Sequence, residues 1–210
     1  MNNNGKYLQY GCGHSAPLNW RNFDASPTLR FERIPLLGQL YTKNASRFPQ
    51  NVEFGDVVVG LPVIDSSVKA VYCSHVLEHL ALEDFRKALA NTHKMLISGG
   101  CFRFVLPDLE FSIKKYCDDS SANAASLFMR ETSLGKVYRS RGLTGFIGDW
   151  FGNSQHFWMW DYKAIAQELE NAGYTNIRRA AYGDAEDIMF EAVEDKQRWE
   201  NCLGVECTKP

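Results

Sequence analysis

Short runs of strand-forming residues alternate with helical patterns through most of this chain. Strands are predicted at residues 7–10, 20–24, 52–59, 68–73 and 101–106, each bounded by Gly, Pro, Asn, Asp or Ser. Shorter strands are expected near Ile177 and Val205. Alternation of strands with helices is typical of a parallel sheet. The pattern therefore predicts an α/β, Rossmann-like fold with a mostly parallel seven-stranded sheet and helices on both faces.

Two helices are marked by their hydrophobic period. From Leu82 onwards apolar residues recur at helical spacing with charged residues between them, and the glycines at 99–100 predict where this helix ends. A second helix is expected between a capping Asp161 and Gly173. Both have one apolar face, as helices that cover a sheet do.

Two segments depart from the alternation. Residues 128–160 are rich in Gly, Arg and aromatic residues, and residues 26–50 contain three prolines and have no clear form. A long segment without regular structure inside a domain is usually functional. We therefore interpret residues 1–210 as a single domain with an irregular aromatic and Gly-rich substrate cap at 118–160.

Composition narrows the class of protein. The chain has 210 residues, 45% of them hydrophobic, as in a globular domain. Its 23 Lys and Arg residues against 25 Asp and Glu residues give no broad positive field, which argues against general nucleic-acid binding. No apolar run approaches the roughly 18 residues of a membrane span, and no secretory signal is visible. Six cysteines without a C-x-x-C pair fit a reducing compartment. We expect a soluble cytoplasmic protein with no membrane partner, of open oligomeric state.

A glycine turn follows the first predicted strand. Residues 11–16 match the G-x-G-x-x-G/A fingerprint of dinucleotide sites, which place an acidic residue about 20 positions further on. Here Asp24 comes eleven residues after Gly13, which leaves room for no more than one helical turn at 14–19. Such a short helix offers little dipole to a pyrophosphate, so a nucleotide without phosphate fits better. S-adenosylmethionine meets this condition, with Asp24 on its ribose hydroxyls. In the alternative interpretation the glycines form only a structural turn and Asp24 caps a helix.

Several ordered motifs extend this interpretation over nearly the whole chain. They lie at residues 10–13, 22–24, 56–80, 99–100, 105–110, 171–174 and 205–208. Together they resemble the type-11 branch of the class I S-adenosylmethionine-dependent methyltransferases. The resemblance implies a methyltransferase that uses S-adenosylmethionine and releases S-adenosylhomocysteine.

The resemblance also implies a cofactor site. Its residues would be Tyr10, Gly11, Cys12 and Gly13 at the methionine part and sulfonium, Asp24 at the ribose, Asp56 and Val57 at the adenine, and Ser74 and His75 beside the cofactor. In two respects the chain departs from the family: Gln9 stands where an acidic residue is usual, and the first helix is nearly absent. These departures keep a second possibility open, a non-catalytic module that retains the fold without binding the cofactor.

A competing motif lies in the middle of the chain. His75, Glu78 and His79 match H-x-x-E-H, the inverted zinc-hydrolase pattern, in which both histidines project from one helix. Residues 71–74 read as a strand, however, so His75 would lie in the turn after it. No third ligand has a diagnostic spacing. We therefore expect no metal site, and interpret Glu78 and His79 as a turn cap and surface pair.

The methyl acceptor is not identified by the sequence, and we expect a small molecule or metabolite. In-line transfer depends mainly on alignment of the reactants, and a base is needed only for a weakly acidic or protonated acceptor. His75 and His156 are the catalytic candidates because imidazoles titrate near neutral pH. The candidate substrate residues are His14, Arg139, Arg141, His156 and Trp158. The aromatic residues around Trp158, namely Trp150, Phe151, Phe157 and Trp160, either line an acceptor pocket or fasten the cap.

Overall fold

One mixed sheet forms the centre of the computed structural model, which describes residues 6–36, 38, 46–138 and 155–210. In these residues it has seven strands in the order β3-β2-β1-β4-β5-β7-β6. The strands are β1 Tyr7–Tyr10, β2 Arg21–Asp24, β3 Val52–Phe54, β4 Val68–Ser74, β5 Leu96–Pro107, β6 Thr175–Ala180 and β7 Cys202–Thr208. Strands β1 to β5 pair in parallel, and β7 runs antiparallel to β5 and β6. The predicted mostly parallel seven-stranded sheet is confirmed.

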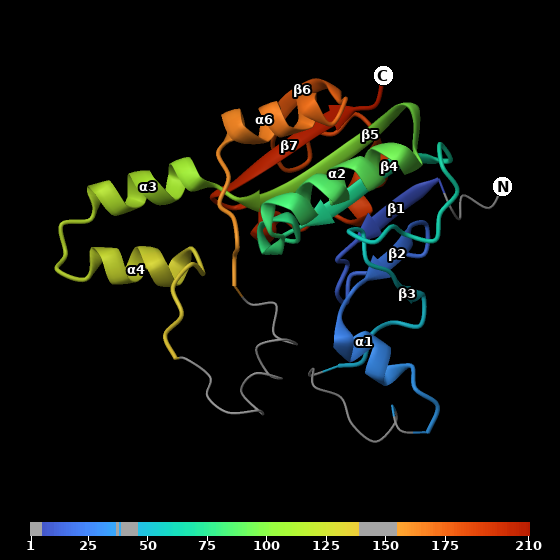
Figure 1. Cartoon of the computed structure of the whole chain (residues 1–210), viewed down its shortest axis with the longest axis horizontal. Helices are drawn as coiled ribbons and strands as arrows, with labels where there is room; N and C mark the ends of the chain where they lie inside the picture. Colours follow the sequence, from blue (N-terminus) through green and yellow to red (C-terminus); the bar gives the residue numbers. More distant parts are fainter. Residues whose placement is uncertain (1–5, 37, 39–45, 139–154) are drawn as a thin grey trace.

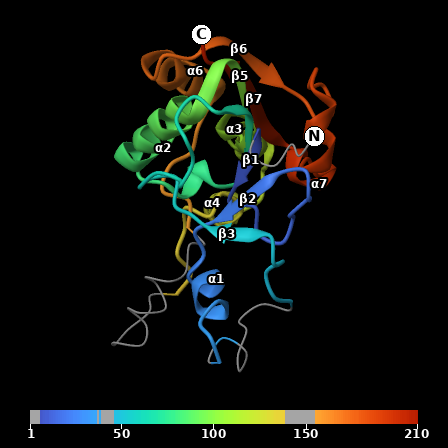
Figure 2. The ribbon, with the colours of Figure 1, turned by 90° about the vertical axis from the view of Figure 1, so that its right-hand side faces the viewer.

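Helices cover both faces of this sheet (Figures 1 and 2). The helical elements are α1 Pro27–Glu32, η2 Leu77–His79, α2 Leu82–Met95, α3 Leu109–Asp118, α4 Ala124–Glu131, α6 Tyr162–Asn171, η3 Ile188–Ala192 and α7 Lys196–Trp199. Helices α2 and α6 lie on one face, with η3 and α7 on the other. Helices α3 and α4 project from the sheet as a pair (Figure 1). None of the helices in the described ranges is long and apolar enough to cross a membrane.

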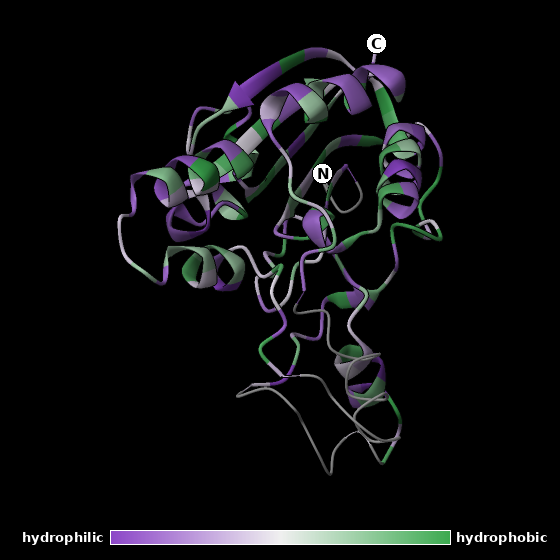
Figure 3. Ribbon diagram, turned by 60° about the vertical axis from the view of Figure 1, so that its left-hand side comes forward, coloured by the Kyte–Doolittle hydropathy of each residue, from purple (hydrophilic) through white to green (hydrophobic). Residues whose placement is uncertain are grey.

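The strands divide their side chains between two cores. Alternate residues of a strand point to opposite faces, so Leu8 packs with α2 and α6 while its neighbour Tyr7 packs with Phe190 and Trp199. Both faces are apolar, as expected of a parallel sheet buried on two sides. The helices in Figure 3 carry green and purple residues on the same turns, as amphipathic covering helices do.

Several predicted boundaries are wrong. The third strand ends at Phe54 and not at residue 59, because Asp56 starts a turn by accepting a hydrogen bond from the Val58 amide (2.8 Å). The helix predicted to reach residue 98 ends at Met95. Strand β5 starts immediately afterwards and takes in both glycines.

Helices lie in two stretches for which no helix was predicted. Helix α1 lies in the proline-rich segment, where Ser26 caps it and Pro27 occupies its first turn. Helix α4 lies within the predicted cap at 118–160. Helix α3, which precedes the cap, was not predicted, although Asp108 caps it by accepting from two amides.

Candidate functional site

The glycine turn after β1 is shaped by two residues with positive φ, Gly11 at 64° and Gly13 at 54°. A Cβ on Gly11 would overlap Cγ2 of Val76, so at that position the turn and the segment after β4 approach too closely for a side chain. A Cβ on Gly13 would meet no atom within 4 Å. Gly13 therefore leaves an open space above the backbone, as a ligand that packs on the turn requires.

Asp24 holds this turn in place from the end of β2. Its carboxylate accepts hydrogen bonds from the Gly13 amide (2.9 Å) and the Ser26 amide (2.8 Å). Ser26 and not Asp24 is the cap of α1. Each carboxylate oxygen has a second lone pair, so Asp24 can still accept from two ribose hydroxyls.

Gln9 stabilises the turn at the position where the family usually has an acidic residue. Its side chain is buried, and its amide donates to the Ser15 carbonyl and to Asn22 Oδ1, both at 2.7 Å. A carboxylate could make neither bond. The connection between β1 and β2 was predicted to hold no more than one helical turn and contains no helix, and Gln9 bonds it to β2.

Two of the predicted cofactor residues present little more than backbone to a ligand. The Tyr10 ring is buried in the core, where its hydroxyl accepts from Thr92 (3.3 Å). Cys12 is buried as well, and burial, reinforced by the nearby Asp24 charge, raises the pKa of its thiol to about 12. Cys12 is therefore a neutral thiol at physiological pH.

Asp56 and Val57 lie in the turn after β3, beside the glycine turn at the same edge of the sheet. Asn91 of α2 donates to the Val57 carbonyl (2.8 Å) and fixes this turn. The Val57 side chain is buried in the core. The Asp56 carboxylate holds the turn through the Val58 amide and is only half-buried.

The segment after β4 lies between the glycine turn and a cavity that is described below. Ser74 ends the strand and accepts from Arg198 with its hydroxyl (2.7 Å) and its carbonyl (2.8 Å). His75 follows with a φ of 54°, an uncommon conformation for a residue with a side chain and one often found at functional sites. Nothing in the sequence indicated Arg198, which lies 124 residues further along the chain.

His75 carries a positive charge at neutral pH. Its Nε2 donates to the Arg198 carbonyl (2.9 Å), and its Nδ1 lies 3.2 Å from Glu78 Oε1. Burial lowers the pKa of His75, but interactions with Cys202, Glu78 and the Arg198 carbonyl outweigh it and raise the pKa to about 10. His75 is therefore a hydrogen-bond donor and not a base.

Glu78 and His79 do not form the predicted turn cap and surface pair. The Glu78 side chain is only 1% exposed, and η2 directs it inward to His75, His79 and His156. The amides of Phe157 and Trp158 both donate to the Glu78 carbonyl, which brings the segment at 155–158 onto η2. Burial lowers the pKa of His156, against the attraction of Glu78, so His156 is neutral at physiological pH.

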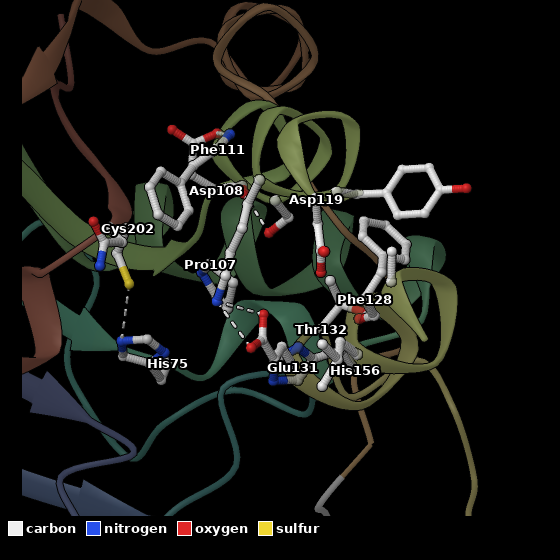
Figure 4. Close-up of a pocket in the computed structure, with 16 residues that line it drawn as sticks. His75, Pro107, Asp108, Phe111, Asp119, Phe128, Glu131, Thr132, His156 and Cys202 are labelled. Carbon is white, nitrogen blue, oxygen red and sulfur yellow. Dashed lines mark hydrogen bonds and ion pairs between the residues drawn. The ribbon is translucent and has the colours of Figure 1, made fainter. Parts of the chain in front are cut away.

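A cavity of about 320 Å³ opens beside this segment, between the ends of β4 and β5 and the α3–α4 pair. Figure 4 shows His75 on one side of it, His156 on another and Phe111 and Phe128 from the two helices. An ion pair from Lys115 to Glu131 (2.7 Å) ties α3 to α4. Apolar rings and a few polar groups are the usual lining of a small-molecule site.

The remaining predicted substrate residues lie elsewhere. His14 is exposed directly after the glycine turn, where its ring stacks on Phe48 at 4.8 Å. Trp158 packs beside the buried Trp160 (5.8 Å between ring centroids) and does not line the cavity. The other candidates lie outside the described residues: Arg139, Arg141, Trp150 and Phe151.

Comparison with known proteins identifies the family. A family model described as a methyltransferase domain matches residues 2–179, most of the chain. The chain belongs to this methyltransferase family. Its cofactor is accordingly S-adenosylmethionine, and it is an S-adenosylmethionine-dependent methyltransferase. A search of the curated proteins gives no match.

Solved structures share the fold of this methyltransferase. One is a Thermotoga maritima S-adenosylmethionine-dependent methyltransferase, described as a possible histamine N-methyltransferase. It has a TM-score of 0.51 and 13% identity, over 98% of this chain and 83% of that one. Another is the structure of a methyltransferase complexed with the Haloferax volcanii Trm112 activator. It has a TM-score of 0.50 and 15% identity, over 97% of this chain and 82% of that one. At such low identity these structures support the Rossmann-like fold and carry no information about the acceptor.

Proposed function

We propose that this methyltransferase binds S-adenosylmethionine over the glycine turn and transfers its methyl group to a small molecule held in the cavity under α3 and α4. The observation that carries the proposal is the position of the segment after β4. Val76 contacts Gly11 of the glycine turn, while the preceding residue, His75, lines the cavity. These two residues therefore lie between two parts of the site. We call the part around the glycine turn and Asp24 the cofactor half, and the part around the cavity the acceptor half.

The roles of the cofactor residues follow from this arrangement. Gly11, Cys12 and Gly13 present backbone to the methionine part, and the Asp24 carboxylate accepts from the ribose hydroxyls. The turn with Asp56 and Val57 lies at the same edge and is our candidate for the adenine contact. Ser74 and His75 close the site beside the sulfonium.

The transfer step needs alignment more than acid–base chemistry. The acceptor attacks the methyl carbon in line while the bond from that carbon to sulfur breaks, which releases S-adenosylhomocysteine. His75 is protonated and suits an electron-rich group of the acceptor. His156 has a neutral imidazole at the cavity wall and is the catalytic candidate for accepting a proton.

Calorimetric titration with S-adenosylhomocysteine tests the cofactor half. We expect wild-type protein to bind and Asp24→Ala to lose about 10- to 150-fold in affinity, because hydrogen bonds to a charged group contribute about 1.5–3 kcal/mol. Asp65→Ala is the matched control, since this carboxylate is exposed and pairs with Lys94 on the surface. No binding by wild-type protein would favour the non-catalytic module. Equal affinity of Asp24→Ala and wild type would refute the ribose role.

A further inference from the structure

Three potential metal ligands from distant parts of the chain meet beside the cavity. Glu78 and His79 come from η2, and His156 comes from the segment that returns after residue 154. One ligand atom from each lies within 4.8 Å of the other two. His156 is the third ligand for which the sequence offered no diagnostic spacing.

The Glu78 carboxylate is buried without the hydrogen bonds that such a group needs. Neither of its oxygens has a hydrogen-bond partner of good geometry among the described residues. The nearest ring nitrogens to its Oε1 are His75 Nδ1 at 3.2 Å and the Nε2 atoms of His79 and His156, both at 4.0 Å. A buried carboxylate is costly unless it is paired or coordinates a metal ion. His75 offers an ion pair to Oε1, whereas Oε2 is a buried oxygen at the cluster with no hydrogen-bond partner among the described residues.

The histidines are oriented as metal ligands are. His79 Nδ1 donates to the backbone carbonyl of Gln155 (2.9 Å), and its Nε2 lies 4.0 Å from Glu78 Oε1. A second nitrogen that donates to a carbonyl is the usual outer-shell arrangement of a metal-bound histidine. The His156 ring packs edge-on against the His79 ring, at 4.9 Å between centroids.

We infer that Glu78, His79 and His156 bind a divalent transition-metal ion. Two imidazoles and one carboxylate suit Zn²⁺ and its neighbours, whereas Mg²⁺ and Ca²⁺ prefer oxygen ligands. The set differs from the H-x-x-E-H motif: His75 lies outside η2 and donates toward Glu78, and Glu78 is a ligand and not a base. The inference does not depend on the proposed function.

The ion would lie at the wall of the acceptor cavity, because His156 belongs to both. Binding would commit the neutral imidazole of His156 to the metal and remove it as a candidate base. A cation at this place would also give the Glu78 oxygens, which lack hydrogen bonds among the described residues, a ligand partner. The expected consequence is that the ion stabilises the folded protein as a ligand does.

The test uses the full chain, stripped of metal with a chelator. Calorimetry with Zn²⁺ alone should show one equivalent bound, and Zn²⁺ should raise the melting temperature. Co²⁺ should give the visible absorption of a low-coordinate site without a thiolate charge-transfer band. Absence of Zn²⁺ binding in wild-type protein overturns the inference, and so does a thiolate band, which would place the ion on cysteine.

Variants then locate the ion. We expect His156→Gln and His79→Gln to lower Zn²⁺ affinity by about 100-fold or more, since even outer-shell changes cost about 10- to 100-fold. His93→Gln, on α2 and outside the cluster, and Cys202→Ser, beside His75, should bind Zn²⁺ as the wild type does. Circular dichroism and a cooperative thermal transition of the metal-free protein check that each variant is folded. Loss of Zn²⁺ in Cys202→Ser with full binding in folded His156→Gln would overturn the assignment.

Discussion

The two halves of the site are built in opposite ways. On the cofactor half the polar side chains satisfy one another within a short stretch of chain: Gln9 bonds Ser15 and Asn22, and Asp24 bonds Gly13. On the acceptor half the polar groups come from distant segments, and the oxygens of Glu78 lack hydrogen-bond partners among the described residues.

The cofactor half is therefore a preformed binding surface, whereas the acceptor half has buried polar groups that can still bind an ion or ligand. Internal hydrogen bonds fix the glycine turn before a cofactor arrives, so little ordering is needed on binding. Buried polar groups without partners are rare in native structures and call for an explanation such as an ion or ligand. The cofactor half should therefore respond to mutation mainly through stability and shape, and the acceptor half mainly through what it binds.

The largest effect on the cofactor half is expected for Gly11→Ala. The new methyl group overlaps Val76, and the residue keeps a positive φ. We expect unfolding free energy to fall by about 2–5 kcal/mol, the sum of about 1–3 kcal/mol for overpacking and about 1–2 kcal/mol for the left-handed backbone. Urea unfolding measures the loss. Adding Val76→Ala should restore the overpacking part only.

Gly13→Ala is the matched control for this pair of glycines. Its φ is also positive, but a methyl group there meets no atom within 4 Å. Only the backbone cost of about 1–2 kcal/mol should appear. The methyl group enters the space proposed for the cofactor, so affinity for S-adenosylhomocysteine should also fall. Equal stability losses in the two alanine variants would contradict the close approach at Gly11.

The cofactor half was largely predictable because its information is local. The glycine turn, Asp24 and the short connection lie within sixteen residues, so their spacing alone restricted the ligand. Turn chemistry and strand periodicity act over the same distances. The remaining errors there, such as the length of β3, arose because an apolar run at 57–59 continues past the point where Asp56 turns the chain.

On the acceptor half, His75 and His156 were named as candidates and both line the cavity, but the way its residues meet was not predictable, for a physical reason. His156 meets Glu78 through backbone bonds between segments 78 residues apart, and no local pattern encodes such a meeting. Glu78 was expected at the surface because charged residues usually are. The capping Asp108 of α3 was a local signal that could have been used.

An intermediate effect is expected for Gln9→Glu, which introduces the acidic residue common in the family. The carboxylate would face two oxygen acceptors, the Ser15 carbonyl and Asn22 Oδ1, in a buried position. Loss of the donor should cost about 1–3 kcal/mol. Burial raises the pKa of the new carboxyl, so the loss should grow as pH rises and the group ionises. Urea unfolding at acidic and neutral pH measures both effects.

Gln9→Met is the control for this substitution. It removes the same two bonds without adding an ionisable group, so its stability loss should not change with pH in the same way. A Gln9→Glu variant that is as stable as wild type and binds S-adenosylhomocysteine more tightly would show that Gln9 weakens the site. That outcome would contradict the claim that internal hydrogen bonds stabilise the cofactor half, and with it the contrast between the two halves.

The smallest effect is expected at the edge strand of the cofactor half. Arg21 of β2 makes two bonds to Glu53 of β3, at 2.7 and 2.8 Å, and this hydrogen bonding lowers the pKa of Glu53 against the effect of burial. A lowered carboxyl pKa stabilises the fold above its unfolded value of about 4.3, and the stabilisation disappears as pH falls through the folded value. Because the pair is partly exposed, we expect Glu53→Gln to cost only about 0.2–1 kcal/mol at neutral pH and nothing at pH well below the folded value. Urea unfolding at low salt across this range provides the measurement. A loss that persists in acid would mean that Glu53 stabilises β3 by side-chain packing and not by charge. Packing and not the ion pair with Arg21 would then hold this edge strand, which precedes Asp56, on the sheet.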